Sequence, residues 1–332
     1  MKDKVFISTP GKSIARAQGT PGGNWSVEFL LNGKDVRCVA ADPQDPNVVY
    51  AGVNDEGVFR SEDRGKTWQH AGLKEQAIRI LAVSPTRRGT LYAGTMPAYL
   101  FKSHDNGKSW EEIQSFRQVP GRWMWFSPAE SPWKAYPLGI ALSPTDPDII
   151  NVGIEFGATL HSEDGGKSWS RHKSGSLRDC HTMVAHPSNG DWVYEAGGSG
   201  GGAAVSQDGG RTWTKAGKDL DRHYGWACAA DPAQPEIWYA SLSTGPAQAH
   251  SWDNAQAHVY RFEGSKASKR LEGGLPQPLD HMPYALLTDR HAPSHLYAGL
   301  SNGEVWYTQD HGEQWEKLDL SLTGVHRSMV MI

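Results

Sequence analysis

One eight-residue motif recurs along the chain and constrains its fold more than any other feature. The motif is a hydroxyl residue, Asp two positions later, Gly two positions after that, then a second hydroxyl residue and Trp. Four copies are complete, a fifth lacks only the second hydroxyl, and a degenerate sixth lies near the N-terminus. A sequence that repeats a short unit in this way is built from similar modules packed side by side. The complete copies are 61–68, 103–110, 162–169 and 206–213, the fifth is 308–315 and the degenerate copy is 18–25.

The residue types of the motif predict a hairpin turn. Asp accepts hydrogen bonds from backbone N–H groups that follow it, and Gly supplies a positive φ. Short apolar strands flank the copies, for example 57–60 before the first and 110–113 across the end of the second. Aspartates at these positions also suit metal binding or catalysis. We favour the turn, because a catalytic site need not recur in every repeat.

A second shared block precedes each turn and supplies two more strands. An apolar segment that ends in Asp-Pro or Ser-Pro, such as 36–43 or 78–85, leads into a Tyr-Ala-Gly segment, such as 49–52 or 91–94. Each repeat therefore contains four short strands separated by turn signals, which is typical of a β-propeller blade. The sequence predicts an all-β fold.

The spacing of the motif tryptophans sets the number of blades. Trp25, Trp68 and Trp110 are 43 and 42 residues apart, whereas two later intervals are longer, which places insertions at 117–136 and 243–257. The last residues fit the missing inner strand of the N-terminal blade. We therefore expect a single domain over 1–332, a seven-bladed β-propeller closed by pairing of the N- and C-terminal strands, which removes exposed sheet edges. The expected blades are 1–33 with 324–332, 34–76, 77–135, 136–178, 179–221, 222–280 and 281–323.

Composition excludes several other classes of protein. The net charge of −4 argues against a nucleic-acid partner, and the absence of a long apolar run argues against a membrane protein. Three cysteines cannot form a disulfide framework, and the first eight residues have no apolar leader segment. These features predict a cytoplasmic protein, although a chain from which a leader had been removed would look the same.

The repeated turn resembles the Asp-box, or BNR, repeat, and nearly the whole chain resembles the Asp-box β-propellers. That group includes sialidases, two-propeller xyloglucanases, sortilin-type receptors and a photosystem II assembly factor. The resemblance implies that the turns lie on the outer edge, away from the ligand-binding face. The sialidase likeness is incomplete, since those enzymes have six blades and a Phe/Tyr-Arg-Ile-Pro motif that is absent here. Because one fold hosts many functions, the function must be argued from a site.

Both insertions map to one face of the predicted propeller, where ligand-binding loops are expected. The first carries Trp123, Trp125 and Trp133. Flat aromatic faces suit sugar rings or other planar ligands, and they also suit a hydrophobic plug that seals the channel. The sequence leaves both interpretations open.

One position in the inner strand of each blade is expected to face the channel mouth. Arg327, Arg37 and Arg79 occupy this position in three neighbouring blades. Three clustered arginines need an anion or nearby carboxylates. The cluster therefore predicts either a site for an anionic ligand or internal pairing with a carboxylate such as Asp35, Asp55, Glu56 or Glu75. The remaining blades carry Leu138, His181, Trp226 and Tyr284 at the same position.

The opposite side of the mouth combines acidic, histidine and aromatic residues. Glycoside hydrolysis needs two carboxylates, and Glu155 and Asp179 are the best candidate pair, with Tyr284 as a nucleophile or an orienting group. Histidines on this face suit a metal only weakly, since no compact ligand motif joins them, so we predict no metal and no cofactor. The expected ligand-binding residues here are His181, Arg222, His223 and Trp226.

Two functions remain compatible with the sequence. The first is a non-catalytic propeller that binds an anionic or carbohydrate-like small molecule, or a protein partner, at the channel mouth. The second is a glycoside hydrolase or lyase that uses carboxylates on the same face. An enzyme requires two carboxylates about 5 to 9.5 Å apart across the pocket, whereas a binding protein does not.

Overall fold

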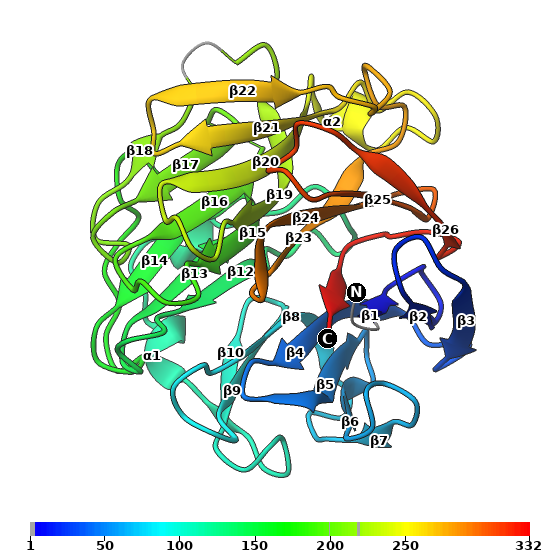
Figure 1. Ribbon diagram of the computed structural model, residues 1–332. Helices are drawn as coiled ribbons and strands as arrows, with labels where there is room; N and C mark the ends of the chain where they lie inside the picture. The colour runs from blue at the N-terminus through cyan, green and yellow to red at the C-terminus, as the bar shows by residue number, and fades with distance from the viewer. Residues whose placement is uncertain (1–3, 199, 218–219) are drawn as a thin grey trace.

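Seven antiparallel sheets form a ring around a central channel (Figure 1). The computed structural model describes residues 4–198, 200–217 and 220–332. Residues 1–3, 199 and 218–219, which belong to two of the expected blades, lie outside this description. Six sheets have four strands and one has three, which confirms the predicted all-β, seven-bladed propeller. No helix among the described residues is long and apolar enough to cross a membrane.

The first three sheets after the N-terminal strands follow the chain in order, with the earliest strand of each on the channel side. The second sheet is β4 (Val36–Asp42), β5 (Asp45–Val53), β6 (Gly57–Ser61) and β7 (Gln69–His70). The third is β8 (Ala77–Val83), β9 (Leu91–Met96), β10 (Leu100–Ser103) and β11 (Glu111–Glu112). The fourth is β12 (Pro137–Leu142), β13 (Ile150–Ile154) and β14 (Thr159–Ser162), with a single bridge between His161 and Ser170 in place of a fourth strand.

The remaining three sheets of the ring repeat the same order. The fifth is β15 (Cys180–Ala185), β16 (Val193–Gly197), β17 (Ala203–Ser206) and β18 (Thr214–Lys215). The sixth is β19 (Tyr224–Ala230), β20 (Ile237–Ser243), β21 (His258–Glu263) and β22 (Ala267–Leu271). The seventh is β23 (Pro283–Asp289), β24 (Ala292–Leu300), β25 (Glu304–Thr308) and β26 (Glu316–Ser321).

The ring closes by pairing the two ends of the chain. The first sheet contains β1 (Lys4–Ser8), β2 (Ile14–Gly19), β3 (Trp25–Leu30) and, as its innermost strand, β27 (Met329–Met331). Phe6 pairs with Met331 and Ser8 with Met329, and Figure 1 shows β1 beside the C-terminal strand. The predicted closure is confirmed.

The repeated motif forms the expected hairpin turn between the third and fourth strands of a blade. In the first copy, Asp63 Oδ1 accepts the backbone N–H of Thr67 at 2.9 Å and Asp63 Oδ2 accepts the Thr67 hydroxyl at 2.6 Å. The Ser61 hydroxyl accepts the N–H of Gly65, and the Trp68 indole donates to the Gly65 carbonyl. The bonds of the aspartate and of the first hydroxyl recur in the other complete copies, so these aspartates hold the turns together. The Trp indole bond to the turn glycine recurs in two of them, while the Trp169 indole donates to the Ser115 hydroxyl instead.

Hydrophobic clusters fill the space between neighbouring sheets. The inner strands are largely buried, as in β19, whose seven residues are all buried. Trp238 and Phe262, both in the sixth sheet, stack with ring centroids 4.3 Å apart in the cluster that this sheet shares with the fifth. This packing fixes the blades rigidly and leaves the loops at each end to form sites.

A β-bulge interrupts the inner strand of six blades at one equivalent position. The pairing register shifts between Val36 and Cys38, and again between Ile78 and Ile80, so that the residue in between lies out of the ladder. A bulge re-aims the side chain of its extra residue. The bulged residues are Arg37, Arg79, Leu138, His181, Trp226 and Tyr284.

Candidate functional site at the channel mouth

The two insertions meet over one mouth of the channel. The short helix α1 (Gln114–Arg117) leads into the first, which contains η1 (Arg122–Met124), and the second contains α2 (Pro246–Ala249). Between them lies a cavity of about 670 Å³, which we call the mouth cavity. Its walls are residues of both insertions together with inner-strand and loop residues. They are Pro128, Ala129, Glu130, Tyr136, Glu155, Phe156, Asp179, His181, Gly198, His223, Tyr224, Trp226, Thr244, Gly245, Pro246, His250 and Arg327.

The channel beneath this cavity brings together the equivalent inner-strand residues. All seven line one space of about 340 Å³, so the sequence alignment of the blades placed them correctly. The bulge explains this placement for six of them, because it turns the extra residue of the inner strand toward the axis, whereas Arg327 lies two residues before β27. They are Arg37, Arg79, Leu138, His181, Trp226, Tyr284 and Arg327.

The three arginines converge on one carboxylate. Arg37 Nη1 lies 2.8 Å from Glu130 Oε1 and Arg79 Nη1 lies 3.0 Å from Glu130 Oε2, while Arg327 Nη2 also pairs with Oε1. Arg37 additionally binds Asp35 Oδ2 at 2.6 Å. Internal pairing is therefore what the structure shows, and its main partner is an acid that sequence reasoning missed.

Electrostatics hold this cluster in its ionised form. Burial raises the pKa of Glu130, but the cations of Arg327, Arg79 and Arg37 outweigh burial, so its pKa lies below the usual range. The Arg79 side chain is 1% exposed, and burial lowers its pKa. A guanidinium this deep depends on Glu130 for charge compensation.

A signal for Glu130 was present in the sequence. It is the only acidic residue in the 117–136 insertion, and that insertion was expected over the same face as the arginines. Of the four carboxylates named as partners, Asp35 does pair with Arg37, whereas Glu56 pairs with Lys34. The insertion contributes an acidic side chain to the mouth, and not only aromatic ones.

The opposite side of the mouth centres on His181. Its ring stacks on Trp226 with centroids 4.5 Å apart, its Nδ1 lies 2.7 Å from the Gly225 carbonyl oxygen, and its Nε2 lies 3.5 Å from Asp179 Oδ1. Burial lowers the pKa of His181, but Asp179 more than compensates, so the pKa is raised. A buried imidazole whose protonated form is stabilised by Asp179 therefore faces the cavity.

His250 from the second insertion joins two tyrosines. Its Nδ1 lies 2.7 Å from the Tyr284 hydroxyl and its Nε2 lies 2.9 Å from the Tyr224 hydroxyl. Burial and the cations of His181 and Arg327 lower the pKa of His250 to about 4, so it is neutral at pH 7. Because Tyr284 donates to the Ala249 carbonyl, it accepts from Nδ1–H, and Tyr224 donates to Nε2.

The two candidate catalytic carboxylates both line the mouth cavity. Glu155 is 4% exposed and accepts the Ser127 hydroxyl at 2.8 Å. Asp179 is 1% exposed and accepts the backbone N–H of Phe156 at 3.3 Å. Tyr284 lies in the channel below them, and burial raises its pKa to about 12. These groups are held by hydrogen bonds, as a site that positions a ligand requires.

Other predicted residues lie at the edge of the mouth cavity or outside it. His223 lines the cavity, but Arg222 does not, because its side chain is bound to the Gln256 carbonyl and to Asp221. Trp123 and Trp133 are 86% and 59% exposed on the first insertion. Trp125 lines a second cavity beside the first, described below.

Among residues 4–198, 200–217 and 220–332, no group of three His, Cys, Asp or Glu side chains is placed to hold a metal. Cys38, Cys180 and Cys228 are buried and unpaired. These cysteines pack as small apolar side chains in the inner strands.

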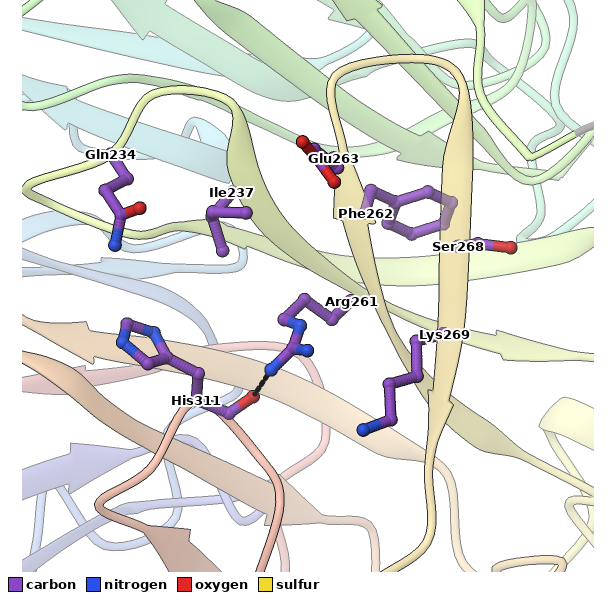
Figure 2. A pocket seen from close by; sticks show the side chains of 8 residues that line it. All are labelled: Gln234, Ile237, Arg261, Phe262, Glu263, Ser268, Lys269 and His311. Carbon is purple, nitrogen blue, oxygen red and sulfur yellow. Dashed lines mark hydrogen bonds between the residues drawn. The ribbon is translucent and has the colours of Figure 1, made fainter.

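A further cavity, of about 340 Å³, lies beside β21, β22 and the turn after β25 (Figure 2). Arg261 donates to the His311 carbonyl there at 3.1 Å and pairs with Glu313 at 3.0 Å. Lys269 pairs with the same carboxylate at 2.5 Å. Both Arg261 and Lys269 are thus paired with Glu313, and Phe262 is the apolar aromatic side chain of the wall.

Comparison with known families gives one match that spans most of the chain. A family model described as the DUF6242 beta propeller domain matches residues 1–261. A search of curated proteins found no match.

Solved structures of two kinds share the fold. An ancestral GH74 enzyme has a TM-score of 0.66 and 22% identity, covering 85% of this chain and 38% of the enzyme. The GH74 xyloglucanase of Xanthomonas campestris has a TM-score of 0.63 and 18% identity, covering 85% and 45%. This chain thus spans less than half the length of either enzyme.

The second kind is YCF48, which matches along most of both chains. The protein from Cyanidioschyzon merolae has a TM-score of 0.58 and 15% identity, covering 88% of this chain and 87% of YCF48. A YCF48 structure with a bound D1 peptide has a TM-score of 0.57 and 12% identity, covering 96% and 86%. At these identities the likeness shows the propeller fold alone.

Proposed function

The chain belongs to the DUF6242 beta propeller domain family, and we propose that it is a binding protein that takes a carbohydrate in the mouth cavity. The observation that carries this proposal is the composition of the cavity wall. Glu130, Glu155 and Asp179 stand there beside the stacked rings of Trp226 and His181. Ligand sites of this size combine apolar walls with a few fixed polar groups.

The chemistry of a sugar matches such a wall. A sugar ring presents hydroxyl donors, which carboxylates accept, and apolar C–H faces, which pack against aromatic rings. The arginines do not leave an empty anion site at the mouth, since Glu130 and Asp35 already neutralise much of their charge. The remaining acceptors favour a ligand that donates hydrogen bonds.

Exposed aromatic side chains around the cavity support a ligand larger than one ring. Trp123, Phe126 and Trp133 lie on the first insertion and Trp252 on the second, where it is 77% exposed. Large exposed apolar side chains gathered on one face are typical of interaction sites. We propose that they extend the contact surface for a chain-like carbohydrate.

The identity of the repeat and the division into domains are part of the same proposal. The hydrogen bonds of the turns support an Asp-box identity for the repeat. We also propose that the seven blades form one domain. The cytoplasmic location expected from the cysteines stays a prediction.

A glycoside hydrolase is the second candidate. It is favoured by the two buried carboxylates Glu155 and Asp179 in one cavity, and by the GH74 enzymes among the structures that share the fold. The distinction is chemical, because a hydrolase must release reducing ends while a binding protein leaves its ligand intact.

Calorimetric titration with neutral oligosaccharides, followed by a reducing-end assay, tests both candidates. We expect Asp179→Asn and Glu155→Gln to weaken binding at least tenfold, which is about 1.4 kcal/mol. Asp164→Asn in a turn on the outer edge is the matched control and should bind normally. Release of reducing ends by the unmodified protein, lost in Glu155→Gln, would establish the hydrolase instead. Failure of every saccharide to bind would refute both.

A further inference from the structure

A second cavity lies beside the mouth cavity, between the first insertion and the fourth sheet. Its volume is about 510 Å³, and we call it the rim cavity. One wall comes from the insertion and the other from β14 and the loops on either side of it. The lining residues are Val119, Pro120, Gly121, Met124, Trp125, Phe156, Gly157, Ala158, Leu160, Arg171, His172 and Arg178.

The rim cavity is positively charged, and none of the described residues that line it is acidic. Arg171 and Arg178 line it, and among the described residues neither guanidinium has an ion pair or a side-chain hydrogen bond. Other arginines nearby are paired, such as Arg117 with Glu112 and Arg211 with Glu163. The two cations of this cavity are therefore available to an external anion.

His172 adds a third donor to the same wall. Its Nδ1 accepts the backbone N–H of Thr159 at 3.1 Å, which leaves the proton of the neutral ring on Nε2. Burial and the Arg178 cation lower the pKa of His172, so the neutral ring is the form present at pH 7. The polar side chains of the cavity are thus all hydrogen-bond donors, while Trp125 and Phe156 supply apolar faces.

Phe156 separates the rim cavity from the mouth cavity and belongs to the walls of both. It is 41% exposed and has a φ of 47°, an uncommon conformation for a bulky residue. Its N–H donates to Asp179 and its carbonyl accepts the N–H of Phe126 at 3.3 Å, so contacts on both sides hold it in place. Strained residues fixed in this way are concentrated at ligand sites.

We infer that the rim cavity is an anion-binding subsite and that the ligand of this face is an acidic oligosaccharide spanning both cavities. One sugar ring lies in the mouth cavity, and a neighbouring ring places its carboxylate or sulfate between Arg171 and Arg178, with Phe156 packed between the two rings. This inference rests on the proposed function and adds the charge and the minimum length of the ligand. A carbohydrate is favoured over a peptide because flat aromatic walls line both cavities, with side-chain acceptors in the mouth cavity and side-chain donors in the rim cavity.

The test compares one ligand in two charge states. A galacturonate tetramer and its carboxyl-reduced, neutral counterpart are titrated calorimetrically into the intact chain at low salt. We expect at least tenfold tighter binding of the acidic tetramer, and this preference should shrink in 0.5 M salt because the arginines are exposed.

The double variant Arg171→Gln/Arg178→Gln should lose the preference while binding the neutral tetramer as before. Arg88→Gln is the matched control, since Arg88 is also an exposed arginine but lies between β8 and β9, at the other end of the channel. Because all three residues are exposed, the thermal midpoints of the variants should stay close to that of the unmodified protein, so a lost preference is not unfolding.

The outcomes separate the two proposals. If the double variant keeps the full preference for the acidic tetramer, the subsite is refuted and the mouth-cavity proposal stands. If neither tetramer binds the unmodified protein while other oligosaccharides do, only the subsite is refuted, and if no oligosaccharide binds, the proposed function fails. The assignment of a carbohydrate would be overturned if an acidic peptide bound the unmodified protein instead of the tetramers and did not bind the double variant.

Discussion

Two arcs of the same channel wall occupy equivalent positions and behave differently. The arginine arc is Arg327, Arg37 and Arg79, and the histidine arc is His181, Trp226 and Tyr284. Bulges aim all of these side chains toward the axis except that of Arg327, which lies two residues before β27. What distinguishes them is the residue that an insertion places against each arc, Glu130 for the first and His250 for the second. The repeat thus sets the direction in which these side chains point, and the insertions set which chemical groups they contact.

The arcs also respond to different ranges of pH. Arginine pairing lowers the pKa of Glu130, so its stabilising contribution is present above the unfolded pKa near 4.5 and is lost as the pH falls through the folded value. Behind the histidine arc, Glu195 is fully buried, and burial raises its pKa to about 7. The stability that the arginine arc contributes therefore changes only at acidic pH, while the stability of the region behind the histidine arc changes near neutral pH.

Removing Glu130 should have the largest effect on stability. Among the described residues, Glu130→Ala leaves the three guanidinium groups with one carboxylate partner, Asp35 on Arg37, which we expect to cost about 3 kcal/mol in urea unfolding. Acetate or formate should raise the midpoint of this variant by occupying the vacated position, with no effect on the unmodified protein. Glu62→Ala breaks an exposed pair with Arg60 and should cost below about 1 kcal/mol. Equal stability of the two variants would show that Glu130 does not hold the arginine arc together.

The second prediction concerns the pH dependence behind the histidine arc. Glu195 Oε2 accepts the N–H of Leu177 at 2.9 Å, and Oε1 lies 2.9 Å from the Thr159 hydroxyl, which in turn reaches the Leu177 carbonyl at 3.0 Å. This network suits a neutral acid, which donates to Thr159 while Thr159 donates to Leu177. Between pH 4.5 and 7 the folded protein holds a proton that the unfolded chain releases, so stability falls as pH rises through this window.

The amide introduced by Glu195→Gln cannot ionise, so this variant should lack the decrease in stability that Glu195 causes as the pH rises. We expect the unmodified protein to lose about 3 kcal/mol relative to the variant between pH 4.5 and pH 8, at about 1.4 kcal/mol per pKa unit. His181, whose pKa is also raised, adds a loss of the same sign that persists in the variant. Urea unfolding at four pH values measures both slopes, and parallel slopes would contradict a raised pKa at Glu195.

The smallest effect is expected from the hydroxyl of Tyr284. Tyr284→Phe removes the acceptor of His250 Nδ1–H and should cost about 1 kcal/mol, the usual value of one hydrogen bond. Tyr307→Phe is the control, because that hydroxyl bonds Glu316 on an outer strand, away from the mouth. A loss of carbohydrate binding in the first variant only would extend the ligand contact from the cavity down to the histidine arc.

Much of the fold was predictable because it depends on local signals. The Asp, Gly and Trp of each turn contact one another within eight residues, so the motif that forms the turn is also visible in the sequence. The bulged position follows from the alignment of inner strands, which is why Arg37, His181 and the rest were expected at the mouth. Because each blade repeats the same local geometry, its sequence repeats the same residue pattern.

The sequence by itself determined the seven blades, their closure through the chain ends and the ring of side chains that faces the channel. Only the tertiary structure decided that Glu130 reaches Arg37 and Arg327, which are 93 and 197 residues away, and that Arg222 is bound outside the cavity. It also decided that Phe156 divides the mouth cavity from the rim cavity. These contacts join irregular loops to distant strands. Such contacts leave no repeated pattern in the sequence, because the residues come together only once the blades are packed.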